Sequence, residues 1–258
     1  MTDQVSRDAS HPLRHLAIIM DGNNRWATLR GLSGIAGHEA GVERIRGILK
    51  ATKAHGIEVV SLFAFSSENW QRPEIEVTGL MSLFASYLKK EAMSLRDDGV
   101  RLKVIGNRAN FSESLRKLIG EAESITASGS FTLVLCVDYG GRWDVVEAAR
   151  ELAMQVQMGR LRVSDICEKT LAKNLQLQDL PDPDLCIRTG GEERISNFLL
   201  WHLAYTELFV SDCYWPDFGP ELLDQAVAEY YSRKRRFGHR RGDAESAIGG
   251  GKSQHVKT

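Results

Sequence analysis

The stretch Leu16-Ala-Ile-Ile-Met-Asp-Gly-Asn-Asn24 sets a run of apolar residues directly ahead of an acidic, glycine-containing turn. A continuous apolar run of this kind is typical of a strand buried on both faces, as in a parallel sheet covered by helices. In such sheets ligands bind outside the carboxyl ends of the strands, which is where the turn lies. This opening therefore predicts an α/β fold with a site after the first strand.

The rest of the chain alternates between patterns typical of strands and helices. We expect further strands at 59–65, 100–105, 131–137, 185–187 and 208–210, and helices at 41–53, between Pro73 and Asp98, and at 112–126, 143–158, 198–205 and 221–237. Alternation of this kind predicts a mostly parallel central sheet flanked by helices on both faces. We expect a single domain at 14–238, between flexible tails at 1–13 and 239–258.

Composition narrows the class of protein. Lys plus Arg total 33 and Asp plus Glu total 34, a balance that argues against a nucleic-acid binder. The cysteines form no Cys-x-x-Cys pair, so we expect buried thiols rather than a zinc site or disulfides, which suits a reducing cytoplasm. We expect neither a signal peptide nor a membrane span. The predicted location is the cytoplasm, with contact to the inner face of the membrane left open.

The first candidate site is the turn after the first strand. Asp21 is a good Mg²⁺ anchor, because this ion prefers carboxylate oxygens and bridges to substrate phosphates. Gly22 lets backbone N–H groups approach an anion, and Arg25 adds positive charge. The alternative is an ordinary turn capped by Asp and Asn side chains.

The second candidate follows the strand at 59–65. Hydroxyl, carboxylate, amide and guanidinium groups there offer hydrogen bonds and charge to a polar substrate, and an indole offers an apolar face. These groups belong to Ser66, Ser67, Glu68, Asn69, Trp70 and Arg72. The alternative is a helix-capping loop, since Ser and Asn are frequent caps.

The third candidate surrounds the Gly190-Gly191 turn. Arg188 and Arg194 flank it, and Ser196 precedes a segment that we predict to be helical. Arginine matches phosphate oxygens with two parallel hydrogen bonds, and a helix N-terminus adds N–H donors. The pattern predicts a diphosphate pocket, with a solvated charged loop as the alternative.

Two single residues complete the set. Glu207 lies in an apolar stretch and needs a cation or hydrogen bonds there, unless it caps an element or faces solvent. His38 lies at the predicted start of a helix, where it can contact a phosphate; a surface histidine is the alternative. The dinucleotide, P-loop and nucleophile-elbow motifs are missing from the sequence.

Together these segments resemble the cis-prenyltransferase family, in particular its bacterial undecaprenyl diphosphate synthases. The similar motifs are His15-Leu-Ala-Ile-Ile-Met-Asp-Gly-Asn-Asn-Arg-Trp26, Phe65-Ser-Ser-Glu-Asn-Trp-Gln-Arg-Pro73, Tyr139-Gly-Gly-Arg-Trp-Asp144, Arg188-Thr-Gly-Gly-Glu-Glu-Arg-Ile-Ser-Asn-Phe-Leu-Leu-Trp201, Trp215-Pro-Asp-Phe218 and Arg235-Arg-Phe-Gly238. They keep the family's order from about Arg14 to Gly238.

The resemblance implies a homodimeric, Mg²⁺-dependent enzyme that adds isopentenyl diphosphate to an allylic diphosphate such as farnesyl diphosphate. It implies undecaprenyl diphosphate, the lipid carrier precursor for peptidoglycan and the cell wall, as product, and membrane contact for its release. The implied roles are metal binding by Asp21 and Glu207, with Asp21 also helping the allylic diphosphate to leave; allylic diphosphate binding by Gly22, Asn23, Asn24, Arg25 and His38; a place near the reacting carbons for Ser66, Asn69, Trp70 and Arg72, with Asn69 as proton acceptor; and isopentenyl diphosphate binding by Arg188, Arg194 and Ser196. Substrate binding is also implied for Trp26, Ser67 and Glu68.

The resemblance also implies a hydrophobic tunnel between the sheet and the helices. Candidate walls, each of which can instead be ordinary core, are Ala64, Leu80, Phe84, Leu88, Ile105, Leu133 and Leu135. Many family members have Arg at Gly34 and His at Glu193, and Asp138 replaces a frequent Asn. With Gly34, one diphosphate contact of the family is either missing or supplied by Arg30. Three rivals remain: a haloacid-dehalogenase-like phosphatase, disfavoured because Asn23 replaces its second Asp; a non-catalytic partner subunit; and a shorter-chain family member.

Overall fold

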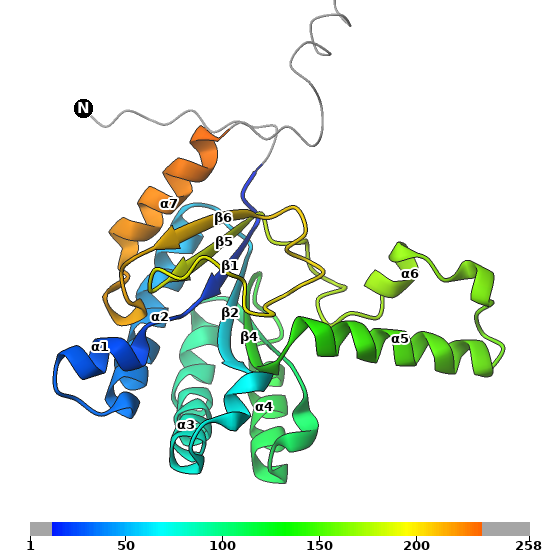
Figure 1. Cartoon of the computed structure of the whole chain (residues 1–258), viewed down its shortest axis with the longest axis horizontal. Helices are drawn as coiled ribbons and strands as arrows, with labels where there is room; N and C mark the ends of the chain where they lie inside the picture. Colours follow the sequence, from blue (N-terminus) through cyan, green and yellow to red (C-terminus); the bar gives the residue numbers. More distant parts are fainter. Residues whose placement is uncertain (1–11, 234–258) are drawn as a thin grey trace, which may run out of the picture.

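Six parallel strands form the central sheet, in the order β3-β4-β2-β1-β5-β6 (Figure 1). The computed structural model describes residues 12–233. The strands are β1 (His15–Ile19), β2 (Val59–Ser66), β3 (Val100–Ile105), β4 (Phe131–Tyr139), β5 (Leu185–Thr189) and β6 (Glu207–Ser211). The predicted α/β class and parallel sheet are confirmed. One prediction is wrong in detail: Arg188 lies inside β5, opposite Ile19 of β1, rather than after the strand.

Within residues 12–233 there are seven helices, of which α1 to α6 connect strands and α7 follows β6. They are α1 (Asn23–Leu29), α2 (Gly34–Ala54), α3 (Glu74–Asp97), α4 (Glu113–Ile125), α5 (Gly141–Gln157), α6 (Glu168–Ala172) and α7 (Pro220–Ser232). Short 3-10 turns lie at η1 (Ser67–Gln71), η2 (Arg108–Asn110), η3 (Val163–Asp165) and η4 (Trp215–Asp217). The last helix ends at Ser232 and not at Phe237, which lies outside the described residues.

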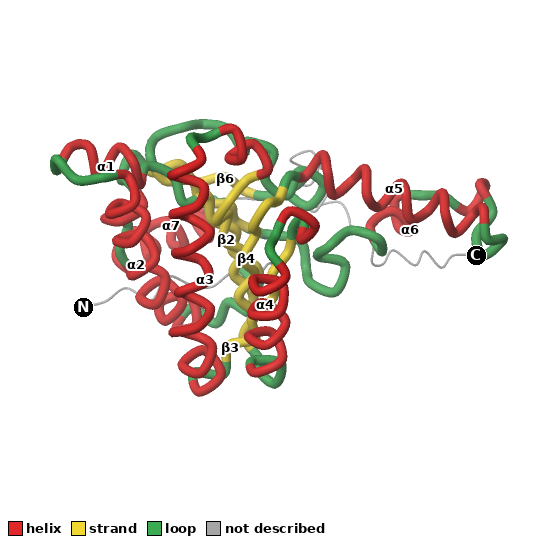
Figure 2. The backbone as a smooth tube through the Cα atoms, turned by 90° about the horizontal axis from the view of Figure 1, so that it is seen from below, coloured by secondary structure: helices red, strands yellow, loops and turns green. Residues whose placement is uncertain are grey.

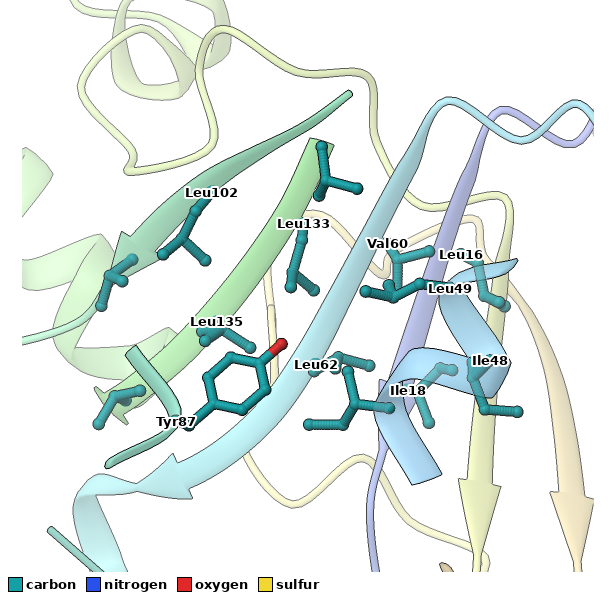
Figure 3. Packing of buried hydrophobic residues seen from close by; sticks show 14 of the residues in the cluster. Leu16, Ile18, Ile48, Leu49, Val60, Leu62, Tyr87, Leu102, Leu133 and Leu135 are labelled. Carbon is teal, nitrogen blue, oxygen red and sulfur yellow. The ribbon is translucent and has the colours of Figure 1, made fainter. Parts of the chain in front are cut away.

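One face of the sheet is covered by α2, α3, α4 and α7 (Figure 2). Alternate residues of the strands, such as Leu16, Ile18, Val60 and Leu62, pack there against Ile48 and other side chains of the helices (Figure 3). This layer holds the larger hydrophobic cluster of the described chain. It separates the sheet from solvent along nearly its whole width.

The opposite face is covered mainly by loop segments, so our expectation of a helix at 198–205 is wrong. Phe198 and Leu199 are fully buried against this face, but residues 198–205 form turns. Positive φ angles at Ser196, Asn197 and Leu199 (47°, 63° and 39°) are incompatible with a helix there. The helices α5 and α6 pack on each other and extend away from the sheet (Figures 1 and 2).

Helix α1 was not predicted, and α2 begins seven residues before the predicted Gly41, at Gly34. Glycines lower the intrinsic helix propensity of 34–41, but they let α2 approach α1 closely. A Cβ at Gly41 would lie 2.5 Å from Asn23 Oδ1, and one at Gly37 would overlap the Asn23 carbonyl. Tertiary packing therefore decides the start of α2.

The predicted tails at 1–13 and 239–258 lie outside the described residues except for Pro12 and Leu13. Leu13 is buried, and its N–H donates to the hydroxyl of Tyr231 on α7 at 3.2 Å. The packed part of the chain thus includes Leu13, one residue earlier than the predicted boundary.

Candidate active site

A cavity of about 310 Å³ lies between the sheet and helices α2 and α3. Its polar end, at the carboxyl ends of the strands, is lined by Asp21, His38, Asn69, Arg72, Arg188 and Ser196. Its other end is apolar and includes Ile45, Leu80, Phe84 and Leu135. The cavity can thus receive a molecule with an anionic head and an apolar tail.

Asp21 lies between two arginines at the polar end. Arg188 Nη2 donates to Asp21 Oδ2 at 2.8 Å, and Arg25 Nη2 lies 3.2 Å from Oδ1. The N–H of Gly22 also donates to Oδ1, at 2.6 Å. Burial by itself raises the pKa of Asp21, but Arg188, Arg25 and the Gly22 N–H together outweigh it and lower the pKa below its usual value. Asp21 is therefore a carboxylate at neutral pH.

Arg188 is almost fully buried and holds the loop after β5 in place. Its Nη1 donates to Ser196 Oγ at 2.8 Å and also to the carbonyl of Arg194. Its Nε is buried without a hydrogen-bond partner within the described residues. A buried guanidinium with a spare N–H beside the cavity suits an anionic ligand, since an unpaired buried donor is costly.

Arg25 and Arg194 lie on opposite sides of Glu192. Arg25 Nη1 is 3.4 Å and Arg194 Nη1 is 2.6 Å from the carboxylate of Glu192. Arg25 also stacks over the ring of Tyr214, with 5.3 Å between its guanidinium carbon and the ring centre. Gly190 permits this approach, because a Cβ there would lie 2.6 Å from Arg25 Nη2. The two arginines are exposed enough to exchange Glu192 for a ligand.

Asn23 and His38 carry polar atoms that lack partners. Asn23 Nδ2 donates to the carbonyl of Met20 at 3.0 Å, while its Oδ1 and His38 Nε2 are buried with no partner in the described residues. Burial lowers the pKa of His38 to about 4, helped by the charge of Arg72. His38 lies in the second turn of α2 and not at the helix start that we predicted.

Glu76 of α3 links Arg72 to Asn24. It accepts hydrogen bonds from Arg72 Nη1 at 2.9 Å and from Asn24 Nδ2 at 3.2 Å. Glu76 is not among the predicted site residues, although its spacing of four residues from Arg72 is a recognisable helical ion-pair signal. A Cβ at Gly34 would lie 2.5 Å from Asn24 Oδ1, so Gly34 leaves room for this arrangement.

Arg30, the candidate for the contact that Gly34 lacks, is paired outside the cavity. Its Nη2 pairs with Asp217 Oδ2 at 3.0 Å, and its guanidinium stacks over Trp26 at 4.2 Å. Trp26 does not line the cavity. Both residues therefore lie beside the predicted diphosphate loop and outside the cavity itself.

The loop after β2 brings Ser66 and Asn69 to the cavity. Ser66 N donates to Asn69 Oδ1 at 3.0 Å, and the two residues form a capping box that fixes the loop. Ser67 donates to Glu68, which accepts a 2.9 Å hydrogen bond from Asn197 Nδ2. Ser67, Glu68 and Trp70 do not line the cavity. Trp70 instead packs edge-on against Phe65 at 5.3 Å.

Asn197 is a second site residue that the sequence pattern did not single out. Its side chain joins the loop after β2 to the start of α5, because its Oδ1 accepts from Arg142 N at 2.9 Å while its Nδ2 holds Glu68. Its φ angle of 63° is one that Asn tolerates better than most residues. Position and φ angle are tertiary properties that the sequence pattern does not reveal.

Glu207 is not brought together with Asp21. It opens β6 opposite Leu185, at the amino end of the sheet, and its carboxylate pairs with Arg233 at 3.0 Å. Asp21 follows the other end of β1, about 16 Å further along the strand direction at ~3.3 Å per residue. The two carboxylates of one chain therefore cannot bind a single cation, contrary to our expectation.

Among the predicted tunnel walls, Ala64, Leu80, Phe84 and Leu135 line the cavity. Leu88 and Leu133 belong to the packed core, and Ile105 packs on the opposite face of the sheet. The alternative of ordinary core therefore holds for these three residues. In the described part of the chain, no helix is long and apolar enough to cross a membrane.

The chain is similar to known proteins over most of its length. Residues 19–238 match the prenyltransferase family model described as "Putative undecaprenyl diphosphate synthase". The chain is 54% identical over 226 residues to the (2E,6E)-farnesyl-diphosphate-specific ditrans,polycis-undecaprenyl-diphosphate synthase of Pseudomonas putida, covering 87% of this chain and 90% of that protein. It is 51% identical to the enzyme of the same name from Pseudomonas aeruginosa, covering 92% and 94% of the two chains.

A solved structure is similar as well. It is lavandulyl diphosphate synthase from Lavandula x intermedia in complex with dimethylallyl diphosphate, with 37% identity and a TM-score of 0.85. The match covers 88% of this chain and 98% of that one. From its motifs, its sheet and these matches, the chain belongs to the undecaprenyl diphosphate synthase family and is a cis-prenyltransferase.

Proposed function

We propose that this enzyme condenses isopentenyl diphosphate onto farnesyl diphosphate and repeats the step to make undecaprenyl diphosphate. The observation that carries the proposal is that Arg25 and Arg188 both pair with Asp21 at the polar end of a cavity whose other end is apolar. Cationic groups held in place beforehand stabilise a departing diphosphate, which is the main electrostatic demand of the reaction. The apolar end receives the isoprenoid tail.

The allylic diphosphate binds at the turn after β1. Arg25 supplies charge, while Asn23, Asn24 and His38 supply neutral polar groups next to it. Two observations support this: Asn23 Oδ1 and His38 Nε2 are buried without partners among the described residues, and the backbone turns at Gly22 with a φ of 98°. His38 binds as a neutral imidazole, because its lowered pKa leaves it uncharged at neutral pH.

Isopentenyl diphosphate binds at the loop after β5, to Arg188, Arg194 and Ser196. Arg188 already holds Ser196 Oγ at 2.8 Å, so the hydroxyl and the guanidinium lie side by side for an anion. Arg194 is exposed and can turn from Glu192 to the ligand. Attack of the isopentenyl double bond forms the new carbon–carbon bond as the allylic diphosphate leaves.

The loop after β2 faces the reacting carbons. Asn69 Oδ1 is occupied by the Ser66 N–H, which leaves Nδ2 to donate to a diphosphate oxygen. Arg72 adds positive charge at the cavity wall. An amide is a weak base, so we propose that Asn69 acts as the proton acceptor only in concert with a diphosphate oxygen or water.

Asp21 is the residue that would hold Mg²⁺. Residues 12–233 contain no group of three or more His, Cys, Asp or Glu side chains that could hold a metal. A single carboxylate still fits, because Mg²⁺ is commonly bound through one or two carboxylates together with substrate phosphates and water. When bound, the ion neutralises diphosphate charge. Asp21 would be available to the ion where Arg25 and Arg188 bind the oxygens of the ligand instead.

The product would serve as the lipid carrier precursor for peptidoglycan. Each buried CH₂ of the tail gains roughly 0.8 kcal/mol, so a long product is released readily only to another apolar phase. We propose that the enzyme works in the cytoplasm and contacts the inner face of the membrane at release.

We also propose a homodimer. Helix α5 exposes Val146 and Met154, which are 47% and 45% accessible, and the edge strand β6 exposes Leu208. An exposed apolar edge strand is a natural place for a partner.

The deciding experiment incubates the purified chain with farnesyl diphosphate, labelled isopentenyl diphosphate and Mg²⁺, and separates the products by chain length. A polyprenyl diphosphate of undecaprenyl length is expected. A short product would support a shorter-chain enzyme, and no product at all would support a non-catalytic partner subunit. Omitting Mg²⁺ or adding a chelator should abolish turnover.

A further inference from the structure

Tyr87 lines two neighbouring cavities. One is the active-site cavity. The other, here called the α2–α3 groove, has a volume of about 810 Å³ and lies between the two helices further from the strand ends. Both cavities are lined by Val42, Leu83 and Tyr87. The groove continues over Leu49, Leu95 and Val100.

Tyr87 reaches from α3 toward the sheet. Figure 3 shows its ring between Leu135 and Leu62, with the hydroxyl directed toward β2. The side chain is 8% exposed, and the described residues offer its hydroxyl no hydrogen bond. Burial raises the pKa of Tyr87 above its usual value, so the phenol stays neutral.

The active-site cavity is too small for a long product. At about 10–15 Å³ per water-sized group, its volume holds roughly 20–30 such groups, which corresponds to a few isoprene units. A tail that grows beyond this limit has to continue elsewhere. The α2–α3 groove is the space that adjoins it directly, and Tyr87 lies at the junction.

Polar contacts between α2 and α3 lie along the outer rim of the groove. Arg46 of α2 pairs with Glu91 of α3 at 2.7 Å, and Lys53 donates to the carbonyl of Asp98. Beneath them lie the apolar side chains named above. An apolar floor under a polar rim fits a hydrocarbon chain that lies between the helices, because such a chain needs no hydrogen bonds of its own.

We propose that Tyr87 determines product length, by resisting passage of the growing tail from the active-site cavity into the α2–α3 groove. This inference rests on the proposed function, because it assumes a polyprenyl tail that grows from the polar end of the cavity toward Tyr87. The bulk of the ring, and not its hydroxyl, is the determinant. Val42 of α2 lines the same passage and narrows it from the side of that helix.

The test measures product chain lengths with farnesyl diphosphate and labelled isopentenyl diphosphate for four variants and the wild-type enzyme. Tyr87→Ala opens the passage and should lengthen the main product by at least one isoprene unit. Val42→Phe fills it and should shorten the product by at least one unit. Tyr87→Phe keeps the ring and should give wild-type lengths.

Leu88→Ala is the matched control. Leu88 is the next residue of α3 and is buried, but it lines neither cavity. This variant should lower the melting temperature without changing product length. Products of wild-type length from both Tyr87→Ala and Val42→Phe, or the same shift from Leu88→Ala, would overturn this inference and leave the proposed function standing. A wild-type enzyme that makes no polyprenyl diphosphate would overturn the proposed function and this inference with it.

Discussion

Arg188 Nη2 donates to Asp21 Oδ2 across 2.8 Å, and this ion pair joins the ends of the neighbouring strands β5 and β1. It also links the two proposed diphosphate sites, since Arg188 belongs to one and Asp21 to the other. Arg188 is nearly buried, whereas Asp21 remains accessible from the cavity. A ligand can therefore exchange for Asp21 without disturbing the packing of Arg188.

Asp21→Ala should reduce turnover by about 100-fold or more, the usual effect of removing a key group that stabilises charge in a transition state. Steady-state kinetics with farnesyl and isopentenyl diphosphates measures it. Circular dichroism should show an intact fold, with a lower melting temperature because Arg188 loses its partner. Glu58→Ala is the control, because that exposed carboxylate pairs with Arg14 away from the site and should keep full activity. An active Asp21→Ala enzyme would refute the assigned role.

The lowered pKa of Asp21 has a consequence for stability in acid. A carboxylate whose folded pKa lies below its unfolded value of about 3.9 stabilises the fold above that value, and the effect is lost as the pH falls through the folded pKa. Asp21→Asn should therefore lose less stability than the wild type below about pH 4. Melting temperatures at a series of pH values measure this, and equal losses would contradict the ion-pair account.

His38 predicts pH dependence in a different window. Its pKa is lowered to about 4 in the folded protein against 6.5 unperturbed, so the unfolded chain binds more protons between these values. Stability should fall as the pH falls from about 6.5 to 4, and His38→Gln should flatten this decline. Denaturant titrations at several pH values test it. A slope unchanged by the substitution would show that His38 is not buried in solution.

Arg194→Ala should chiefly raise the KM for isopentenyl diphosphate, with a smaller effect on the KM for farnesyl diphosphate. A charge-assisted hydrogen bond of about 1.5–3 kcal/mol corresponds to a change of roughly 10- to 150-fold. Arg150→Ala, which removes an exposed arginine paired with Glu147 on α5, is the control and should leave both constants unchanged. An unaltered KM in Arg194→Ala would remove this residue from the site.

Gly37→Ala should destabilise the protein and weaken allylic diphosphate binding, because the new Cβ would overlap the Asn23 carbonyl and displace the turn after β1. Gly47→Ala on the same helix meets nothing within 4 Å and should instead stabilise the protein by about 0.5–1 kcal/mol. Urea denaturation and the KM for farnesyl diphosphate measure both effects. Similar stability for the two variants would contradict the close packing of α1 on α2.

The sequence predicts most of the sheet, because each strand is an apolar run with a sharp end. β3 lies at the expected residues 100–105, where Gly99 precedes it. The helical start of α2 and the turns at 198–205 were not predictable in this way. In both places, contacts between distant segments override local propensity. Helix α2 packs on α1 through glycines, and Phe198 and Leu199 pack on the face of the sheet opposite α2.

Part of the candidate site was predictable, because the direction of the strands shows at which end of the sheet a ligand binds. Asp21, Asn69 and Arg188 lie at the end of the sheet that strand direction indicates. Our placement of Glu207 in the metal site was wrong, because Glu207 is the first residue of β6 and the amino end of a parallel strand lies away from the site. The apolar residues next to Glu207 in the sequence suggested a buried acid that needs a cation. In the structure Glu207 pairs with Arg233, which lies further along the chain.

Helix α2 touches both ends of the substrate path. Gly37 and Gly41 pack against Asn23, while Val42, the residue after Gly41, lines the cavity beside Tyr87. Because these residues belong to one helix, a shift of α2 changes both the binding of the diphosphate and the space left for the isoprenoid tail. Substitutions at the two ends should consequently show non-additive kinetics, and engineering a different chain length will require retuning of affinity for the diphosphate.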